Sequence, residues 1–363
     1  MSANTNADAA GASVSRDAAR DLLERVVATP SVTGEETACG EVLVDFFESH
    51  GREAWLDAVG NVRAPADDAA LLTSHLDTVP GDIPVRVEDG EEGPELWGRG
   101  SVDAKGPLVA MAVAAVRTGV SFAGVVGEEV DSRGAHYLVE NRAAPEAVVN
   151  GEPSGSDGIT LGYRGLVAGT YVVTSESGHT SRPENNAIQD AIEWWSRVEA
   201  LFEDEGEEWT PVFERVTPKP VEIEGGTSDD GLSVETTMEV QLRVPPSHTC
   251  EEVRELADGQ LDGGTVRWHD AVPPVMESPR TDVARAFRVA VREAGGDPRL
   301  LRKTGTADMN VFAEAWDCPK GVVTYGPGNS DLDHAPDEHL PLAEFDRATE
   351  VLVSVASSLR GES

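Results

Sequence analysis

The stretch AALLTSHLD at residues 69–77, followed by DAKGPLVAMAVAAVRTGVSFAGVV at 103–126, decides the fold expected for this chain. The first stretch is an apolar run that ends in polar residues, as a buried strand does, and the second is a long apolar helix leading into another apolar run. The alternation continues with a helix at 132–141 and an apolar run at 147–149. Such alternation is typical of an α/β fold with a mostly parallel sheet and helices on both of its faces.

A second pattern interrupts the first after Gly165. Strands that alternate in polarity, at 167–174, 221–224 and 233–244, surround a helix near 186–202, which indicates a smaller α+β insertion. A helix at 281–294, a strand at 322–324 and a helix at 342–358 then return to the first pattern. The predicted division is a disordered start at 1–14, a catalytic domain at 15–165, an inserted domain at 166–274 and the rest of the catalytic domain at 275–363.

Two capping patterns mark the first helices. Ser15 precedes an apolar stripe that runs to about Ala28 and is expected to cap that helix. Thr33, with Glu36 three residues later, has the spacing of a capping box before a second helix.

The charge balance disfavours several kinds of partner. The 363 residues include 66 Asp and Glu against 29 Lys and Arg, a formal net charge of −37. Such a charge disfavours binding to nucleic acid or to an anionic membrane. Because the acidic excess runs along the whole chain, we interpret it as the halophilic adaptation of a protein from a salt-rich cell.

The sequence also predicts a cytoplasmic protein without structural disulfides. The longest apolar run, at 108–116, is far below the ~20 residues of a membrane span, and residues 1–15 carry no signal region. Cys39, Cys250 and Cys318 are an odd number without C-x-x-C spacing, so neither a disulfide framework nor a cysteine zinc site is expected.

Polar side chains follow the apolar runs at the carboxyl ends of the predicted strands, where open α/β sheets bind ligands. His75, Asp103, Glu129 and Glu152 occur at intervals close to the length of one strand plus one helix. Each strand can therefore deliver one side chain to the same crevice. His334, which follows a later apolar run, is a fifth candidate.

A divalent metal would explain why imidazoles and carboxylates share one crevice, because unpaired buried carboxylates are costly. Nitrogen and oxygen donors without a thiolate favour Zn²⁺, and Co²⁺ or Mn²⁺ also fit. In His75-x-Asp77 both side chains lie on one face of a strand. This spacing predicts that Asp77 accepts the remaining N–H of the imidazole.

The pair Glu128-Glu129 is expected to divide the chemistry. Adjacent side chains on an extended chain point in opposite directions, so one carboxylate can bind metal while the other faces the substrate. A carboxylate beside two metals can take a proton from a water that the metals have acidified and pass it to a leaving nitrogen. The pair therefore indicates metal-assisted amide hydrolysis, with one Glu as ligand and one as base.

Together these motifs resemble the zinc aminoacylase family, which includes acetylornithine deacetylase, succinyl-diaminopimelate desuccinylase and carboxypeptidase G. The resemblance spans about residues 15–355, and the motifs occur in the family's order. They are LTSHLDTVP at 72–80, GRGSVDAKG at 98–106, GEE at 127–129, EP at 152–153, SGHTS at 177–181 and HAPDE at 334–338.

The resemblance implies a site for two metal ions. Its implied ligands are His75, Asp103 and Glu152 for one ion, and Asp103, Glu129 and His334 for the other. Asp103 would therefore bridge the ions, and Glu128 would be the general base. The peptide bond after Asp103 is often cis in this family.

The resemblance further implies that the insertion at 166–274 is a lid and dimerisation domain, so a homodimer is expected. His179 resembles the lid histidine that reaches the partner subunit's site and polarises the scissile carbonyl. Arg243 resembles a lid arginine that meets a substrate carboxylate, with a surface ion pair as the alternative.

Three segments resemble the archaeal and thermophile branch of the family, namely GRGSVDAKGP at 98–107, GYRG at 162–165 and RKTGTADMN at 302–310. Members of this branch release lysine or ornithine from the C-terminal glutamate of a small acidic amino-group carrier protein. Arg164, Lys303 and Arg182 would then meet the amino-acid carboxylate or the acidic tail of the carrier, although loop cations are common on acidic proteins.

Other activities stay open from the sequence. Within enzymes, the alternatives are an acetylornithine or acetyl-lysine deacetylase, a succinyl-diaminopimelate desuccinylase and a metallo-dipeptidase. The non-enzyme alternative is an inactive carrier-binding homologue. A serine or cysteine nucleophile is disfavoured, because no G-x-S-x-G occurs and Cys39 has no histidine close to it in sequence.

Overall fold

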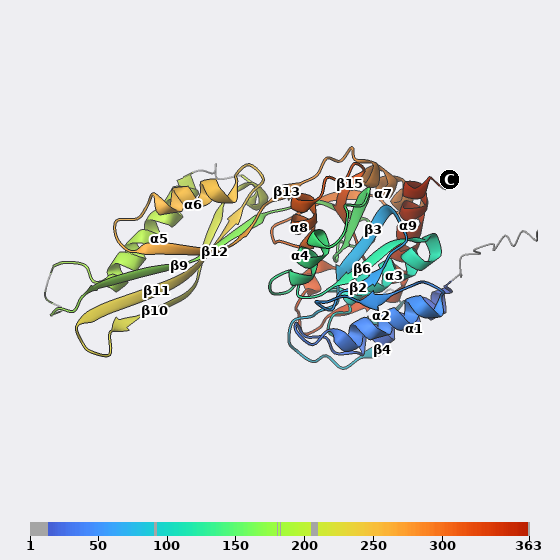
Figure 1. Ribbon diagram of the computed structural model, residues 1–363, viewed down its shortest axis with the longest axis horizontal. Coiled ribbons are helices and arrows are strands. Elements are labelled where there is room, and N and C mark those ends of the chain that lie inside the picture. The colour runs from blue at the N-terminus through green and yellow to red at the C-terminus, as the bar shows by residue number, and fades with distance from the viewer. Residues whose placement is uncertain (1–13, 91–92, 180, 182, 205–209, 362–363) are drawn as a thin grey trace, which may run out of the picture. The chain divides into compact units, whose positions relative to one another are not determined.

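Figure 1 shows a computed structural model of the chain, in which residues 14–90, 93–179, 181, 183–204 and 210–361 are described. They form two compact units. The first comprises the described residues of Met1–Leu161, Glu277–Leu301 and Val311–Ser363, and the second those of Gly162–Met276 and Arg302–Asn310. Of the predicted disordered start, residues 1–13 lie outside the described residues. None of the helices in the described part has the length and apolar character of a membrane span.

A large sheet with parallel central strands organises the first unit. Across the sheet the strands are β1 (Trp55–Leu56), β2 (Val62–Ala64), β6 (Val120–Val125), β3 (Asp67–His75), β7 (Ala147–Gly151), β15 (Gly321–Thr324), β8 (Gly158–Tyr163) and β13 (Val275–Met276), and β14 (Arg299–Lys303) also pairs with β8. The pairs β6-β3, β3-β7 and β7-β15 are parallel. The strands at both edges are antiparallel to their neighbours. A small antiparallel sheet has the order β16 (His339–Pro341), β5 (Gly93–Trp97) and β4 (Arg86–Gly90).

Helices between the strands supply the rest of the core. They are α1 (Arg16–Val27), α2 (Thr37–Ser49), α3 (Lys105–Thr118), α4 (Arg133–Glu140), α7 (Asp282–Glu293), α8 (Asp308–Ala315) and α9 (Leu342–Arg360). The most buried is α3, which is lined almost wholly with buried side chains and packs against α1, α9 and β3. A helix that is apolar all round belongs inside a core, which explains the uninterrupted apolar stretch in its sequence.

One of the two predicted caps is confirmed and the other is wrong. Ser15 precedes α1, and its Oγ accepts the N–H of Ala18. At α2 the N-cap is Glu36, which makes no side-chain capping bond. Thr33 instead donates its hydroxyl to Oδ2 of Asp77 at 2.8 Å. The predicted capping box does not form, because the Thr33 hydroxyl donates its hydrogen bond to a carboxylate distant in sequence and does not cap the helix.

The second unit is an antiparallel sheet with helices. Its strands are β10 (Thr217–Thr227), β11 (Ser233–Val244), β9 (Gly165–Glu176) and β12 (Thr265–Val272) in that order, and its helices are α5 (Ala187–Asp204) and α6 (Cys250–Asp258) with the 3-10 turn η1 (Val212–Glu214). Tyr171 of β9 stacks on Trp194 of α5 with ring centroids 4.5 Å apart, which anchors the helix on the sheet. Three of the strands and α5 match the predicted segments, whereas β12 and α6 were not predicted. The predicted fold class, a mostly parallel α/β sheet with a smaller α+β part, is confirmed.

Candidate metal centre

Three of the candidate residues lie at the carboxyl ends of neighbouring parallel strands. His75 is the last residue of β3, whereas Glu129 and Glu152 come shortly after the ends of β6 and β7. In the sheet β3 lies between β6 and β7, in parallel register with both. The regular spacing along the sequence therefore corresponds to adjacent positions along one edge of the sheet.

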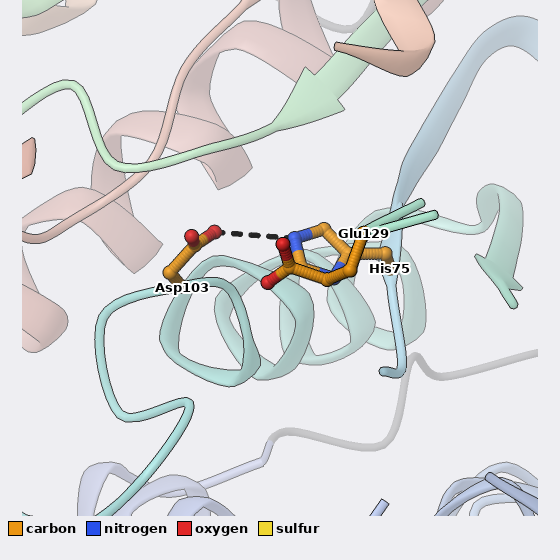
Figure 2. Close-up of side chains that lie close together, drawn as sticks. All are labelled: His75, Asp103 and Glu129. Atoms are coloured by element: carbon orange, nitrogen blue, oxygen red, sulfur yellow. Dashed lines mark hydrogen bonds and ion pairs between the residues drawn. The ribbon is translucent and has the colours of Figure 1, made fainter. Parts of the chain in front are cut away.

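Asp103 lies between two imidazoles. Its Oδ1 is 3.2 Å from Nε2 of His75, and its Oδ2 is 3.2 Å from Nε2 of His334. Glu129 approaches the same atom of His334, with its Oε2 at 3.0 Å. Figure 2 shows His75, Asp103 and Glu129 pointing toward one another. Four side chains from separate segments, Asp103 among them, thus form one connected cluster.

His334 reaches this cluster from a strained backbone conformation. It follows the 3-10 turn η2 (Ser330–Leu332), and its φ of 60° is in the left-handed region that a residue with a Cβ rarely adopts. Such conformations persist where the surroundings over-determine them, and they concentrate at functional sites. The imidazole is half-exposed, so it forms the solvent-facing side of the cluster.

The carboxylates control the charge of both imidazoles. Burial by itself lowers the pKa of His75, but the nearby carboxylates of Asp103 and Asp77 outweigh it and raise that pKa well above its usual value. The hydrogen bond with Asp103 raises the pKa of His334 to about 9. Burial favours the neutral form of Asp103, yet its bonds with both imidazoles lower its pKa. The cluster is therefore a focus of negative charge that attracts protons or cations.

The donor set fits a divalent cation. Donor atoms of His75, Asp103 and Glu129 lie within 4.8 Å of one another. Among the described residues, neither Asp103 nor Glu129 forms an ion pair with a lysine or arginine, although both side chains are largely buried. Uncompensated carboxylates are costly to bury, so a bound cation would relieve a real electrostatic conflict. Imidazole and carboxylate donors without a thiolate suit Zn²⁺, Co²⁺ or Mn²⁺.

Glu152 and Glu128 lie at the margin of this cluster. Glu152 is buried, and its Oε1 accepts a hydrogen bond from Nδ2 of Asn150 at 3.4 Å. The negative charges of Glu152 and Glu128 both contribute to the raised pKa of His75. Both carboxylates are therefore near enough to act electrostatically on the site.

Asp77 is placed differently from the simplest expectation. The nearest acceptor for Nδ1 of His75 is the backbone carbonyl of Asp77, at 2.9 Å, whereas the Asp77 carboxylate is 3.6 Å away. Its two carboxylate oxygens accept the backbone N–H groups of Glu128 and Glu129, each at 3.1 Å. Asp77 therefore positions the Glu128-Glu129 peptide as well as the imidazole of His75. The sequence spacing indicated a contact with His75 but not the contacts with Glu128 and Glu129.

Glu338 is a residue of this region to which the sequence analysis assigned no role. Its carboxylate is fully buried and accepts hydrogen bonds from residues 99–103, the segment that ends in Asp103. The Asp103-Ala104 peptide bond is cis, as the family resemblance implies. The only signal for Glu338 was its place at the end of the HAPDE segment, because the spacing of residues does not reveal a partner 235 positions away.

The remaining candidates belong to the second unit. His179 is exposed, and its Nδ1 lies 2.8 Å from Oγ of Ser181. Arg182 lies outside the described residues. Lys303 is half-buried, and its backbone carbonyl accepts the N–H of Arg164.

Arg164 and Arg243 are neighbours with different surroundings. The buried guanidinium of Arg164 donates to the backbone carbonyls of Thr304 and Val212 and to the hydroxyl of Thr217, and burial lowers its pKa to about 10. These contacts favour a structural role for Arg164. The half-buried Arg243 donates to Oγ1 of Thr306 at 3.4 Å. No carboxylate within the described part of the chain pairs with Arg243, so its charge is available to a ligand.

Comparison with known proteins identifies relatives over nearly the whole chain. Residues 71–358 match the model of peptidase family M20/M25/M40. The chain is 39% identical to a LysW-lysine hydrolase from Deinococcus radiodurans, over 95% of this chain and 98% of the relative. It is 38% identical to a putative LysW-lysine/LysW-ornithine hydrolase from Thermococcus kodakarensis, over 94% of this chain and 92% of the relative.

Solved structures share the fold at lower identity. The crystal structure of aminopeptidase PepT from Bacillus cereus superposes with a TM-score of 0.75 at 20% identity, and the match covers 96% of this chain and 100% of that one. At this identity the likeness concerns the fold.

Proposed function

The chain belongs to peptidase family M20/M25/M40, and we propose that it is a two-metal amidohydrolase that releases lysine, ornithine or both from the C-terminal glutamate of an amino-group carrier protein. Membership makes the chain a metal-dependent hydrolase of amide bonds. The inactive carrier-binding homologue considered from the sequence is thereby set aside.

The names of the relatives support the substrate. The two relatives described above are named as hydrolases of LysW-linked lysine or of LysW-linked lysine and ornithine, and the chain covers 98% and 92% of their lengths. The proposed partner is therefore a LysW-like carrier protein, and the proposed role is a step in lysine or arginine biosynthesis. The sequence segments at 98–107, 162–165 and 302–310 point to the same branch of the family.

The observation that carries the proposal is the position of Asp103 between His75 and His334, with one carboxylate oxygen 3.2 Å from each imidazole. A carboxylate so placed can bridge two cations. The proposed ligands are His75, Asp103 and Glu152 for one ion and Asp103, Glu129 and His334 for the other. Zn²⁺ is the proposed metal, with Co²⁺ or Mn²⁺ able to replace it.

When bound, the two ions would act as Lewis acids on the scissile carbonyl and would make water more acidic. Glu128 would accept the proton of the attacking water on its carboxylate and donate it to the departing amine nitrogen. Asp77 supports this role because it holds the backbone N–H groups of both Glu128 and Glu129, which fixes the base beside a ligand. The contact between the Asp77 carbonyl and Nδ1 of His75 leaves Nε2 free to serve as the donor atom.

Residues of the second unit also have proposed roles in the reaction. We assign His179 to the scissile carbonyl in the site of a partner subunit, within a homodimer formed through this unit. Arg243 would bind the carboxylate of the released amino acid, and the lack of an acidic partner among the described residues favours this assignment. Lys303 and Arg164 lie in the same part of the unit. Arg164 would not touch the substrate; its bond to Thr304 would hold the 302–310 segment, to which Arg243 also donates a hydrogen bond.

A direct comparison of substrates tests the proposal. Purified full-length protein with added Zn²⁺ or Co²⁺ is assayed against carrier-linked lysine, carrier-linked ornithine, N-acetylornithine, N-acetyl-lysine, succinyl-diaminopimelate and dipeptides. We expect the highest kcat/KM for a carrier-linked amino acid. A higher kcat/KM for any of the small substrates would overturn the carrier assignment while leaving the amidohydrolase in place.

A further inference from the structure

Glu338 is a buried carboxylate that the proposed chemistry does not use. Its side chain has no exposed surface, and four donors converge on it. Oε1 accepts the backbone N–H groups of Val102 and Asp103 at 2.8 and 3.1 Å. Oε2 accepts a hydrogen bond from the backbone N–H of Gly100 at 3.1 Å and another from Nη1 of Arg99 at 2.8 Å.

These donors belong to one short loop before α3. Three of the four are backbone N–H groups in a loop, so they do not take part in the hydrogen bonds of a helix or a sheet. A single carboxylate that gathers several backbone N–H groups fixes their relative orientation, and charged acceptors form stronger bonds than neutral ones. Without Glu338 these buried donors would lose their acceptor. The loop conformation therefore depends on a residue far away in the sequence.

The segment that carries Glu338 holds Asp103 at two points. Nε2 of His334 contacts Oδ2 of the Asp103 side chain at 3.2 Å, and Oε1 of Glu338 accepts the backbone N–H of the same residue at 3.1 Å. The backbone carbonyl of Glu338 also accepts the N–H of Gly98 at 3.4 Å. One stretch of five residues, 334–338, thus fixes both the main chain and the carboxylate of Asp103.

We propose that Glu338 is a positioning residue, which holds the backbone at Asp103 so that its carboxylate stays between His75 and His334 and the centre binds divalent metal tightly. This inference rests on the proposed metal-dependent function. Glu338 itself touches neither imidazole in the contacts described for it, so it acts through Asp103. Partners that orient metal ligands typically change metal affinity or activity by about 10–100-fold when they are replaced.

The test is the metal affinity of Glu338→Gln, measured without substrate. Glutamine has the same size but turns an NH₂ group toward donors that need an acceptor. Metal-free full-length protein is titrated with Zn²⁺ and with Co²⁺ against a competing chelator, and the visible spectrum of bound Co²⁺ reports the ligand geometry. We expect the dissociation constants to rise by about 10–100-fold and the Co²⁺ spectrum to change.

Asp346→Asn is the matched control. Asp346 pairs with Arg20 between α9 and α1, so this variant also loses a partly buried charge contact but none at residues 99–103. We expect a lower Tm in both variants and unchanged metal affinity in Asp346→Asn. An equal loss of metal affinity in the two variants would show general destabilisation and would overturn the proposal.

Arg99→Gln keeps the test decisive if Glu338→Gln does not fold. It removes the side-chain donor to Glu338 and leaves the three backbone donors in place, so a smaller loss of metal affinity in the same direction is expected. Unchanged metal affinity in the folded variants, beside tight binding by the unmodified protein, would overturn the role of Glu338 alone. Failure of the unmodified protein to bind either metal would overturn both this role and the proposed function.

Discussion

Oε2 of Glu129 lies 3.0 Å from Nε2 of His334, although 205 residues separate the two along the chain. The contact joins the loop after β6 to the loop after β15. Between these loops the chain forms the whole second unit and then returns to the first. The candidate centre therefore exists only when the first and the last of the three parts of the first unit have folded together.

Glu128→Gln should stop turnover without emptying the centre. Glutamine cannot accept the proton of the attacking water, and loss of a general base typically costs about 10²–10⁴-fold in rate. We expect kcat to fall by at least that range while metal content stays near two ions per chain. Glu129→Gln is the control, because the same change at the neighbouring residue should reduce metal content as well. Wild-type kcat in Glu128→Gln would exclude Glu128 as the base.

Removal of metal should inactivate the enzyme reversibly. Prolonged dialysis against a chelator should abolish hydrolysis, and addition of Zn²⁺ or Co²⁺ should restore it, because within the described part of the chain no lysine or arginine pairs with Asp103 or Glu129. Metal analysis and activity are followed in parallel. Activity that survives with less than about 0.1 metal per chain would exclude a metal mechanism.

Asp77→Asn should disturb the base and a ligand together. The two carboxylate oxygens of Asp77 accept the N–H groups of Glu128 and Glu129, and an amide can satisfy only one of them. We expect kcat to fall by about 10–100-fold, as for other partners of metal ligands. Thr33→Val is the matched control, since it removes one donor to Asp77 but leaves both of its acceptors. Equal, small effects of both variants would mean that Asp77 has no positioning role.

Mixed dimers test whether His179 acts across an interface. Both His179→Ala and Glu128→Gln homodimers should be nearly inactive. A heterodimer of the two variants has one site with intact Glu128 that receives intact His179 from its partner, so up to half of the wild-type activity per dimer should return. The readout is activity after co-expression with two affinity tags. Heterodimers as inactive as the parents would place His179 in its own subunit's site or outside catalysis.

Salt should stabilise the protein strongly. At a formal charge of −37 the native state repels itself, and raising the salt from about 0.1 to about 1 M shortens the Debye length from ~10 to ~3 Å. We expect Tm to rise steadily with KCl over this range. Sucrose, which is excluded from protein surfaces without screening charge, is the control and should have a smaller effect at equal osmolality. A Tm that falls with KCl would contradict the halophilic interpretation.

The sequence predicted the sheet and the candidate residues on its edge because both depend on periodicity. His75, Glu129 and Glu152 repeat with the length of a βα unit, and parallel neighbours convert that repeat into adjacent strand ends. Helices with long apolar stretches, such as α3, were predicted for the same reason. β12 and α6 were missed although both carry a signal: Val266 and Trp268 alternate with polar residues in β12, and Thr249 with Glu252 forms a capping box at the start of α6.

Contacts between a side chain and a distant segment of the chain could not be predicted. Thr33 has the spacing of a capping residue, yet its hydroxyl binds Asp77. The positive charge of Arg164 suits a substrate carboxylate, yet its guanidinium donates hydrogen bonds to backbone carbonyls. Glu338 has no periodic relation to the loop it holds. The cytoplasmic location, the metal identity and the homodimer stay predictions.

The 334–338 segment lies near the end of the chain, so it is synthesised after the other residues of the candidate centre. A chain emerging from the ribosome carries His75, Asp103 and Glu129 long before it carries His334 and Glu338. Because the last two supply both the half-exposed imidazole and the acceptor for the Asp103 loop, a chain that ends before them lacks the complete candidate centre. Under the proposed function, hydrolysis can therefore begin only after translation has passed Glu338, beyond the end of β15.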